Sequence, residues 1–112
     1  MPARVVRTRE AAADLVGIAR WTIRSFGPDQ GRRYVAAIEA TIAGLRRMPE
    51  ITGARPCPDL GTGVWTIRAA HGRARNRHLL IFAYTPGDRR PIVTIVRILH
   101  DSMDLARHLP PD

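Results

Sequence analysis

The sequence predicts an α+β fold in which an antiparallel helical hairpin packs on a small, mainly antiparallel sheet, in the order β-α-α-β-β-β with a short C-terminal helix. Two observations lead to this fold class. Apolar residues recur at about 3.6 residues in the first half of the chain and alternate along the second half. The connections are mostly short, which favours antiparallel neighbours. Because 112 residues suffice for one core, we expect a single domain over residues 1–112.

The first half begins with a β-prone segment at residues 3–7 and continues as two helices. Thr8 is the expected N-cap of the first helix. Gly27 suits the position after a helix and Pro28 the first position of the next, so the helices meet there. The second helix should run to about Met48, because a proline follows. The expected apolar faces are Ala11, Leu15, Ile18, Ala19, Thr22 and Phe26 on the first helix, and Tyr34, Ile38, Thr41, Ile42, Leu45 and Met48 on the second.

The second half contains three strand candidates, at residues 64–69, 77–84 and 91–99. Before them, residues 49–63 hold three prolines and three glycines, so we expect a loop. The last two strands are apolar on both faces at their middles, which predicts that they are central in the sheet.

The chain has a formal net charge of +8, and all 18 of its basic residues are arginine. A GC-rich genome would explain arginine in place of lysine; the planar guanidinium also suits phosphate and carboxylate groups. The charge excess itself predicts an acidic partner, either nucleic acid or an acidic protein segment. The single cysteine, Cys57, fits a reducing cytoplasm. With no apolar run of membrane-spanning length, signal peptide or metal-ligand spacing, we expect a cytoplasmic protein without membrane contact, metal or cofactor.

The stretch from Val93 to Leu109 is the most informative part of the chain. A β-branched run passes through Arg97-Ile98-Leu99-His100, and a short segment with Met103-Asp104 and Arg107-His108-Leu109 follows. This ordered set resembles the end of the ParE toxins, members of the ParE/RelE toxin–antitoxin superfamily. Further matching positions are Asp14-Leu15, Ile18, Gly27, Tyr34-Val35, Ile38, Leu45, Pro49, Leu79, Ile81, Phe82 and Tyr84. Two segments depart from the ParE pattern: residues 63–68 look more like HigB-like relatives, and residues 73–77 are unusually basic.

The resemblance implies the ParE/RelE-like fold and the role of toxin in a type II toxin–antitoxin system. A ParE-like toxin would inhibit DNA gyrase by trapping its cleaved-DNA complex, without catalysis of its own. A small ParD-like antitoxin, with a DNA-binding N-terminus and a flexible C-terminal segment, would neutralise it in a hetero-oligomer. The superfamily also includes RelE-like, ribosome-dependent mRNA endonucleases, which are the alternative function. A third possibility, direct nucleic-acid binding, rests on the net charge alone.

For an endonuclease, the candidate catalytic residues are Arg68, Arg97 and His100, because attack of a ribose hydroxyl on phosphate needs cations and an acid–base group. For a gyrase inhibitor there is no catalytic set, and the expected target contacts are Arg97, His100 and Arg107.

Arg97 and His100 also have structural interpretations. Regular strand alternation places Arg97 on the face of Ile95, where it could pair with Asp101 or Asp104 and hold the tail. His100 could be a hydrogen-bonded end of its strand. The acidic residues after it are expected to cap the last helix rather than to bind a metal.

The expected antitoxin contacts are two tryptophans and a run of arginines, namely Trp21, Trp65, Arg73, Arg75 and Arg77. Tryptophan is enriched at the energetic centres of interfaces, and alternating arginines on an extended segment suit an acidic partner. The competing interpretations are that the tryptophans cover the edge of the core and that the arginines form a solvated hairpin tip.

Overall fold

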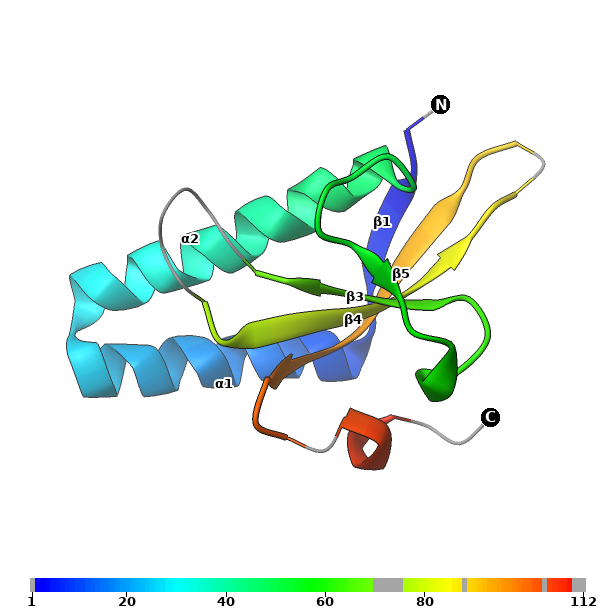
Figure 1. The fold of residues 1–112 in the computed structure, drawn as a ribbon. Helices are drawn as coiled ribbons and strands as arrows, with labels where there is room; N and C mark the ends of the chain where they lie inside the picture. The colour runs from blue at the N-terminus through cyan, green and yellow to red at the C-terminus, as the bar shows by residue number, and fades with distance from the viewer. Residues whose placement is uncertain (1, 70–75, 88, 104, 110–112) are drawn as a thin grey trace.

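Residues 2–69, 76–87, 89–103 and 105–109 are described by the computed structural model (Figure 1). In this part of the chain, five strands form one mixed sheet in the order β1-β5-β4-β3-β2. The strands are β1 (Arg4–Arg7), β2 (Arg55–Pro56), β3 (Val64–Arg68), β4 (His78–Thr85) and β5 (Ile92–His100). β1 runs parallel to β5 and the other pairs are antiparallel, which confirms the predicted α+β class and the central position of β4 and β5.

Two helices, α1 (Arg9–Phe26) and α2 (Pro28–Gly44), form an antiparallel hairpin against the sheet (Figure 1). Gly27 separates them with a φ of 91°, a left-handed backbone that favours glycine. Gly31, in the first turns of α2, allows the helices to approach closely, since a Cβ there would lie 2.5 Å from Cγ1 of Ile23. The predicted junction at Gly27 and Pro28 is confirmed.

Thr8 joins β1, α1 and β5. Its hydroxyl accepts a hydrogen bond from the amide of Ala11 at 3.0 Å, as the predicted N-cap should. The same hydroxyl donates to the carbonyl of Val96 at 2.7 Å, and the Thr8 amide donates to the carbonyl of Ile95 at 2.9 Å. The start of α1 is therefore fixed to the middle of β5.

The predicted apolar face of α1 is right in four positions and wrong at its end. Ala11, Leu15, Ile18 and Thr22 are buried. Phe26, however, is 55% exposed. It ends α1, where the hairpin projects beyond the sheet (Figure 1) and no strand lies opposite.

The second helix ends earlier than predicted. α2 stops at Gly44, and the 3₁₀ turn η1 (Leu45–Arg47) replaces the last turn expected before Met48. The residue before a proline disfavours the helical region, and Met48 is extended with ψ of 142°. Leu45 and Met48 are still buried, so the apolar face is kept. The predicted loop 49–63 also contains β2 and a 3₁₀ turn, η2 (Pro58–Leu60).

A β-bulge interrupts the pairing of β5 with β4. Ile81 pairs with Arg97 and Phe82 pairs with Ile95, so Val96 has no partner on β4. The bulge shifts the alternation by one residue, and Ile98 joins Ile95 in the core cluster. The prediction that Arg97 shares the face of Ile95 is therefore wrong.

The expected C-terminal helix is a single 3₁₀ turn, η3 (Leu105–His108), which lies near the end of β5 (Figure 1). Within the described residues, neither α-helix is both long and apolar enough to cross a membrane.

We expect Thr8→Ala to lower the free energy of unfolding by about 1–2 kcal/mol, because it removes the cap of α1 and the bond to the Val96 carbonyl together. Thr8→Ser keeps the hydroxyl and should lose less than half as much. Urea denaturation of the two variants measures the difference. Equal losses would show that the hydroxyl contributes little.

Candidate functional site

Arg97, which together with His100 is shared by the two alternative functions, is held in a bidentate ion pair with Asp14 of α1. Its Nε and Nη2 lie 2.7 and 2.9 Å from the two carboxylate oxygens, and Asp14 also accepts the amide of Ile98 at 3.0 Å. Nη1 of Arg97 donates to the carbonyl of His108 at 3.0 Å. The pairing expected with Asp101 is therefore wrong, although Arg97 does hold the tail; Asp104 lies outside the described residues.

Asp101 pairs with two arginines, Arg68 at the end of β3 and Arg77 just before β4, instead of capping a helix. Its carboxylate lies 2.9 Å from Nη1 of Arg68 and 3.0 Å from Nη2 of Arg77. These guanidinium groups hold the pKa of Asp101 well below its usual range. The η3 turn begins only at Leu105, so the predicted capping role of Asp101 is wrong.

His100 has the structural role that the sequence allowed for it. Its Nδ1 lies 2.7 Å from Oγ of Ser102 and accepts the Ser102 amide at 3.2 Å. These bonds close the turn that follows β5, so His100 is a hydrogen-bonded end of the strand.

His78 forms a second, buried histidine site that the sequence analysis missed. The amide of Arg77 donates to the hydroxyl oxygen of Tyr34 at 3.2 Å, and this hydroxyl lies 2.7 Å from Nδ1 of His78. The His100 ring meets that of His78 edge to face, 5.4 Å away between centroids. Burial and the neighbouring His100 lower the pKa of His78 to about 4, so its imidazole is neutral at pH 7 and shares a hydrogen bond with the Tyr34 hydroxyl.

A cavity of about 490 Å³ lies between α1, the end of β5 and the tail. We call it the α1–β5 groove. It is lined by Ala13, Asp14, Gly17, Ile18 and Trp21 of α1, by His78 of β4, by Arg97 to His100 of β5, and by Ser102, Met103 and His108. The structure thus brings together Trp21, Arg97 and His100, three of the residues singled out from the sequence.

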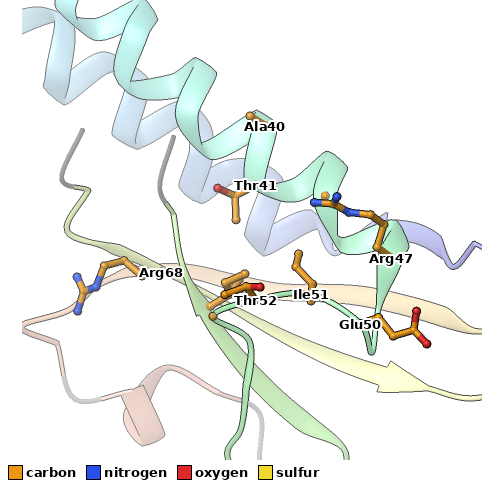
Figure 2. Close-up of a pocket in the computed structure, with 10 residues that line it drawn as sticks. Ala40, Thr41, Arg47, Glu50, Ile51, Thr52 and Arg68 are labelled. Atoms are coloured by element: carbon orange, nitrogen blue, oxygen red, sulfur yellow. The ribbon is translucent and has the colours of Figure 1, made fainter. Parts of the chain in front are cut away.

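A second cavity, of about 540 Å³, lies between α2, the loop after it and β3 (Figure 2). Ile51 and Thr41 extend into it, whereas the charged groups of Glu50 and Arg68 point outward at its two ends (Figure 2). Of the predicted site residues, this α2–β3 cavity includes Arg68.

The predicted antitoxin contacts differ in their exposure and in what they pack against. Trp21 is 53% exposed and packs edge to face on Phe26, with ring centroids 5.7 Å apart. Trp65 is half-buried, packs against the core and meets Tyr84. The side chain of Arg77 is 66% exposed even though it is paired with Asp101. Arg73 and Arg75 lie outside the described residues, and Arg107, a predicted target contact, is exposed on η3.

In the parts of the chain that the structure describes, no group of three or more His, Cys, Asp or Glu residues is arranged to hold a metal ion. The three described histidines all line the α1–β5 groove. His78 and His100 form hydrogen bonds and an edge-to-face ring contact, and His108 contributes its backbone carbonyl.

Comparison with known proteins assigns the family. The family model described as ParE toxin of type II toxin-antitoxin system, parDE, matches residues 5–105. The chain belongs to the ParE toxin family. The Toxin ParE of Escherichia coli is 38% identical over 104 residues, which cover 93% of this chain and 90% of that protein.

Two solved structures share the ParE-type fold. The chain is similar to a structure described as a chromosomal ParDE TA system from P. aeruginosa, with a TM-score of 0.68, 23% identity and coverage of 88% of this chain and 95% of that chain. It is also similar to a YoeB/ParE toxin from Agrobacterium tumefaciens, with a TM-score of 0.57, 16% identity and coverage of 87% and 96%. At these identities the two structures show the fold alone. Membership in the ParE family makes the chain a toxin of the type II toxin–antitoxin class.

Within this ParE-type fold, Asp14 was not predicted as a partner of Arg97, and Asp101 was expected to pair with Arg97 instead of with Arg68 and Arg77. The contact between Tyr34 and His78 was not predicted either. Asp14 and Tyr34 had been noted as family positions, but a sequence position does not show which side chain it meets. His78 begins a strand whose middle is apolar on both faces, and an imidazole directly before that apolar run was the available signal.

We expect Asp14→Asn to lower the free energy of unfolding by about 2 kcal/mol, because it weakens three hydrogen bonds in a largely buried place. Arg97→Lys should cost a similar amount, since an ammonium group cannot form the bidentate pair. Glu39→Gln is the control, because it breaks the exposed Arg7–Glu39 pair and should change stability by less than about 0.5 kcal/mol. Equal effects of Asp14→Asn and Glu39→Gln in urea denaturation would contradict the assigned role.

The lowered pKa of His78 predicts acid destabilisation. An unfolded histidine has a pKa near 6.5 and the folded one about 4, so between these values the unfolded chain binds more protons. Stability contributed by neutral His78 is therefore complete above pH 6.5 and falls by about 3 kcal/mol as the pH is lowered to 4. Urea titrations across this range should show the slope, and His78→Gln should flatten it. An unchanged slope in that variant would assign the effect to other groups.

Proposed function

We propose that the chain inhibits DNA gyrase by binding to it, without catalysis of its own, and that a small ParD-like antitoxin neutralises it in a cytoplasmic hetero-oligomer. Family membership supports this proposal at the level of the toxin class. The absence of catalysis in this proposal rests on one observation: the three residues that an endonuclease would need are already bound to neighbouring side chains.

Each of these three residues is bound to a neighbour in the folded chain. Arg97 is paired with Asp14, and Arg68 lies 2.9 Å from Asp101. Stabilising a phosphorane requires positive charge that is not already neutralised. His100 is engaged by Ser102 through Nδ1. These contacts therefore support structural or binding roles for the three residues rather than a role in cleaving RNA.

The proposed target contacts lie on one part of the surface. Arg97 holds the tail through the carbonyl of His108, which places Arg107 next to the end of β5. His100 ends the same strand and is half-buried. We assign gyrase binding to this end of β5 and the tail.

The proposed antitoxin contacts are Trp21, Trp65, Arg73, Arg75 and Arg77. Trp21 is the best supported of these, because its large apolar side chain is more than half exposed beside a groove. Trp65 is supported less, since it already packs on the core.

The proposal predicts that the purified chain, incubated with gyrase, supercoiled plasmid and ATP, yields linear plasmid after detergent and protease treatment. Arg107→Ala should weaken this effect several-fold. Arg55→Ala, which removes an exposed arginine of β2 at the other edge of the sheet, should not. Intact plasmid from a chain that still arrests growth, together with mRNA cuts lost in His100→Ala, would overturn the proposal in favour of the endonuclease.

A further inference from the structure

Exposed arginines from three segments come together at the end of the sheet where β1 and β5 begin. The segments are β1, the 3₁₀ turn η1 after α2, and the turn between β4 and β5. Figure 1 shows the start of the chain, the end of α2 and the β4–β5 turn at the same end of the molecule. We call these residues the arginine patch: Arg4, Arg46, Arg89 and Arg90.

Backbone hydrogen bonds hold the three segments side by side. The amide of Ala3 donates to the carbonyl of Arg46 at 2.7 Å, which joins the start of the chain to η1. The amide of Arg4 donates to the carbonyl of Pro91 at 2.9 Å, which joins it to the β4–β5 turn. Hydrogen-bonded backbone segments lie about 5 Å apart, so the arginines of the patch are close neighbours.

Arg90 is also held by its side chain. Its Nε donates to the carbonyl of Pro2 at 3.0 Å. Gly87 permits a close turn before it, since a Cβ at Gly87 would lie 2.8 Å from the carbonyl oxygen of Arg90. A guanidinium has five N–H donors, so Arg90 keeps donors for another molecule while this bond fixes its position.

The charge of the patch is not compensated by ion pairs. None of its four arginines has an ion-pair partner among the described residues. Elsewhere in the described chain, five arginines pair with carboxylates, namely Arg7, Arg32, Arg68, Arg77 and Arg97. The segments of the patch supply two carboxylates, Glu50 and Asp88, of which Asp88 lies outside the described residues, and Arg47 adds a further positive charge. This end of the chain therefore has an excess of positive charge.

The composition of the patch suits a phosphate backbone better than a protein surface. The centre of a protein interface is rich in aromatic and apolar side chains. Of the six large apolar side chains that are exposed in the described residues, only Ile92 borders the patch, since the others lie on α1 or the tail. The exposed aromatic residues, Trp21 and Phe26, are among those on α1, so the patch offers no stacking surface for unpaired bases. Guanidinium groups bind phosphate oxygens well, which leaves the backbone of a duplex as the fitting ligand.

The patch is well separated from the proposed gyrase contacts. Arg4 pairs with Ile92 at the start of β5, whereas His100 ends that strand. A strand rises about 3.3 Å per residue, so the length of β5 puts roughly 25 Å between them. A duplex held at the patch would leave the tail uncovered.

We infer that the arginine patch binds the phosphate backbone of duplex DNA without reading its sequence. This inference goes beyond the proposed inhibition of gyrase and does not rest on it. If both hold, the chain contacts gyrase through the end of β5 and the tail, and contacts the DNA that gyrase holds through the patch.

The experiment measures the fluorescence anisotropy of two labelled duplexes of unrelated sequence, titrated with the purified full chain at several salt concentrations from about 50 to 200 mM. Four engaged arginines predict that the logarithm of the association constant falls with the logarithm of salt concentration with a slope of about −3 to −4. The two sequences should bind with affinities that agree within about threefold, because backbone contacts carry no sequence information.

Arg89→Gln with Arg90→Gln removes two charges of the patch and keeps most of both side-chain stems. This double variant should bind roughly tenfold more weakly at about 100 mM salt, and its salt slope should be smaller by about 2. Arg33→Gln with Arg55→Gln is the matched control, because it removes two exposed arginines without ion pairs in the described chain, on α2 and β2. The control should weaken binding by less than about threefold. Thermal melting verifies that both variants are folded.

Three results would overturn the inference. Equal losses in the two double variants would assign DNA binding to net charge alone. A preference of more than about tenfold for one duplex sequence, or for single-stranded DNA, would contradict recognition of a duplex backbone. Binding of polyglutamate more tightly than DNA, with the same dependence on Arg89 and Arg90, would assign the patch to an acidic protein.

The test also separates this inference from the proposed function. A chain that yields linear plasmid with gyrase but does not bind duplex DNA would overturn the role of the patch and leave gyrase inhibition standing. A chain that binds duplex DNA through Arg89 and Arg90 but has no effect on gyrase would support the patch and overturn the proposed target.

Discussion

The carboxylate of Asp14 is the group on which the arrangement of α1, β5 and the tail depends. Pairing of β1 with β5 ends at Ile95, and the bulge at Val96 follows directly. Beyond this point the edge of β5 that faced β1 needs other partners for its polar groups. Asp14 supplies one by accepting the Ile98 amide, and it binds the guanidinium of Arg97 at the same time. Beyond the last pair between β1 and β5, a side chain of α1 thus provides a hydrogen-bond acceptor that a neighbouring strand would otherwise provide.

This ion pair also determines the shape of the surface around it. Arg97 is oriented so that its remaining donor reaches the carbonyl of His108, which places the 3₁₀ turn η3 beside the groove. Its charge is compensated by Asp14, so it contributes shape more than attraction. Positive charge without an ion-pair partner in the described part of the chain comes instead from Arg20 and Arg24 of the same helix.

The parts of the fold that the sequence predicted are those governed by local physics. A capping threonine, a Gly-Pro junction and a change from helical to alternating apolar spacing act within a few residues, and each gave an element near its true bounds. The bulge at Val96 escaped prediction because it depends on pairing between strands. The end of α2 was placed one turn too late. Pro49 keeps Met48 out of the helical conformation, and a 3₁₀ turn at Leu45–Arg47 replaces the last α-helical turn before it.

The candidate site was predicted as a set of residue types but not as a set of contacts. Arg97 and Asp14 are 83 residues apart, and Arg68 and Asp101 are 33 apart, so only the folded chain shows that these charges neutralise each other. That difference is what supports the proposed function. The same arginines that look catalytic in the sequence are, in the folded chain, paired groups that hold the end of β5 and the tail in place. Catalysis of phosphate chemistry needs uncompensated charge in a site that excludes water, whereas recognition needs a fixed shape with free charge at its rim. The described surface around α1 and β5 has the second character, which is the physical basis for proposing that this ParE toxin inhibits its target by binding.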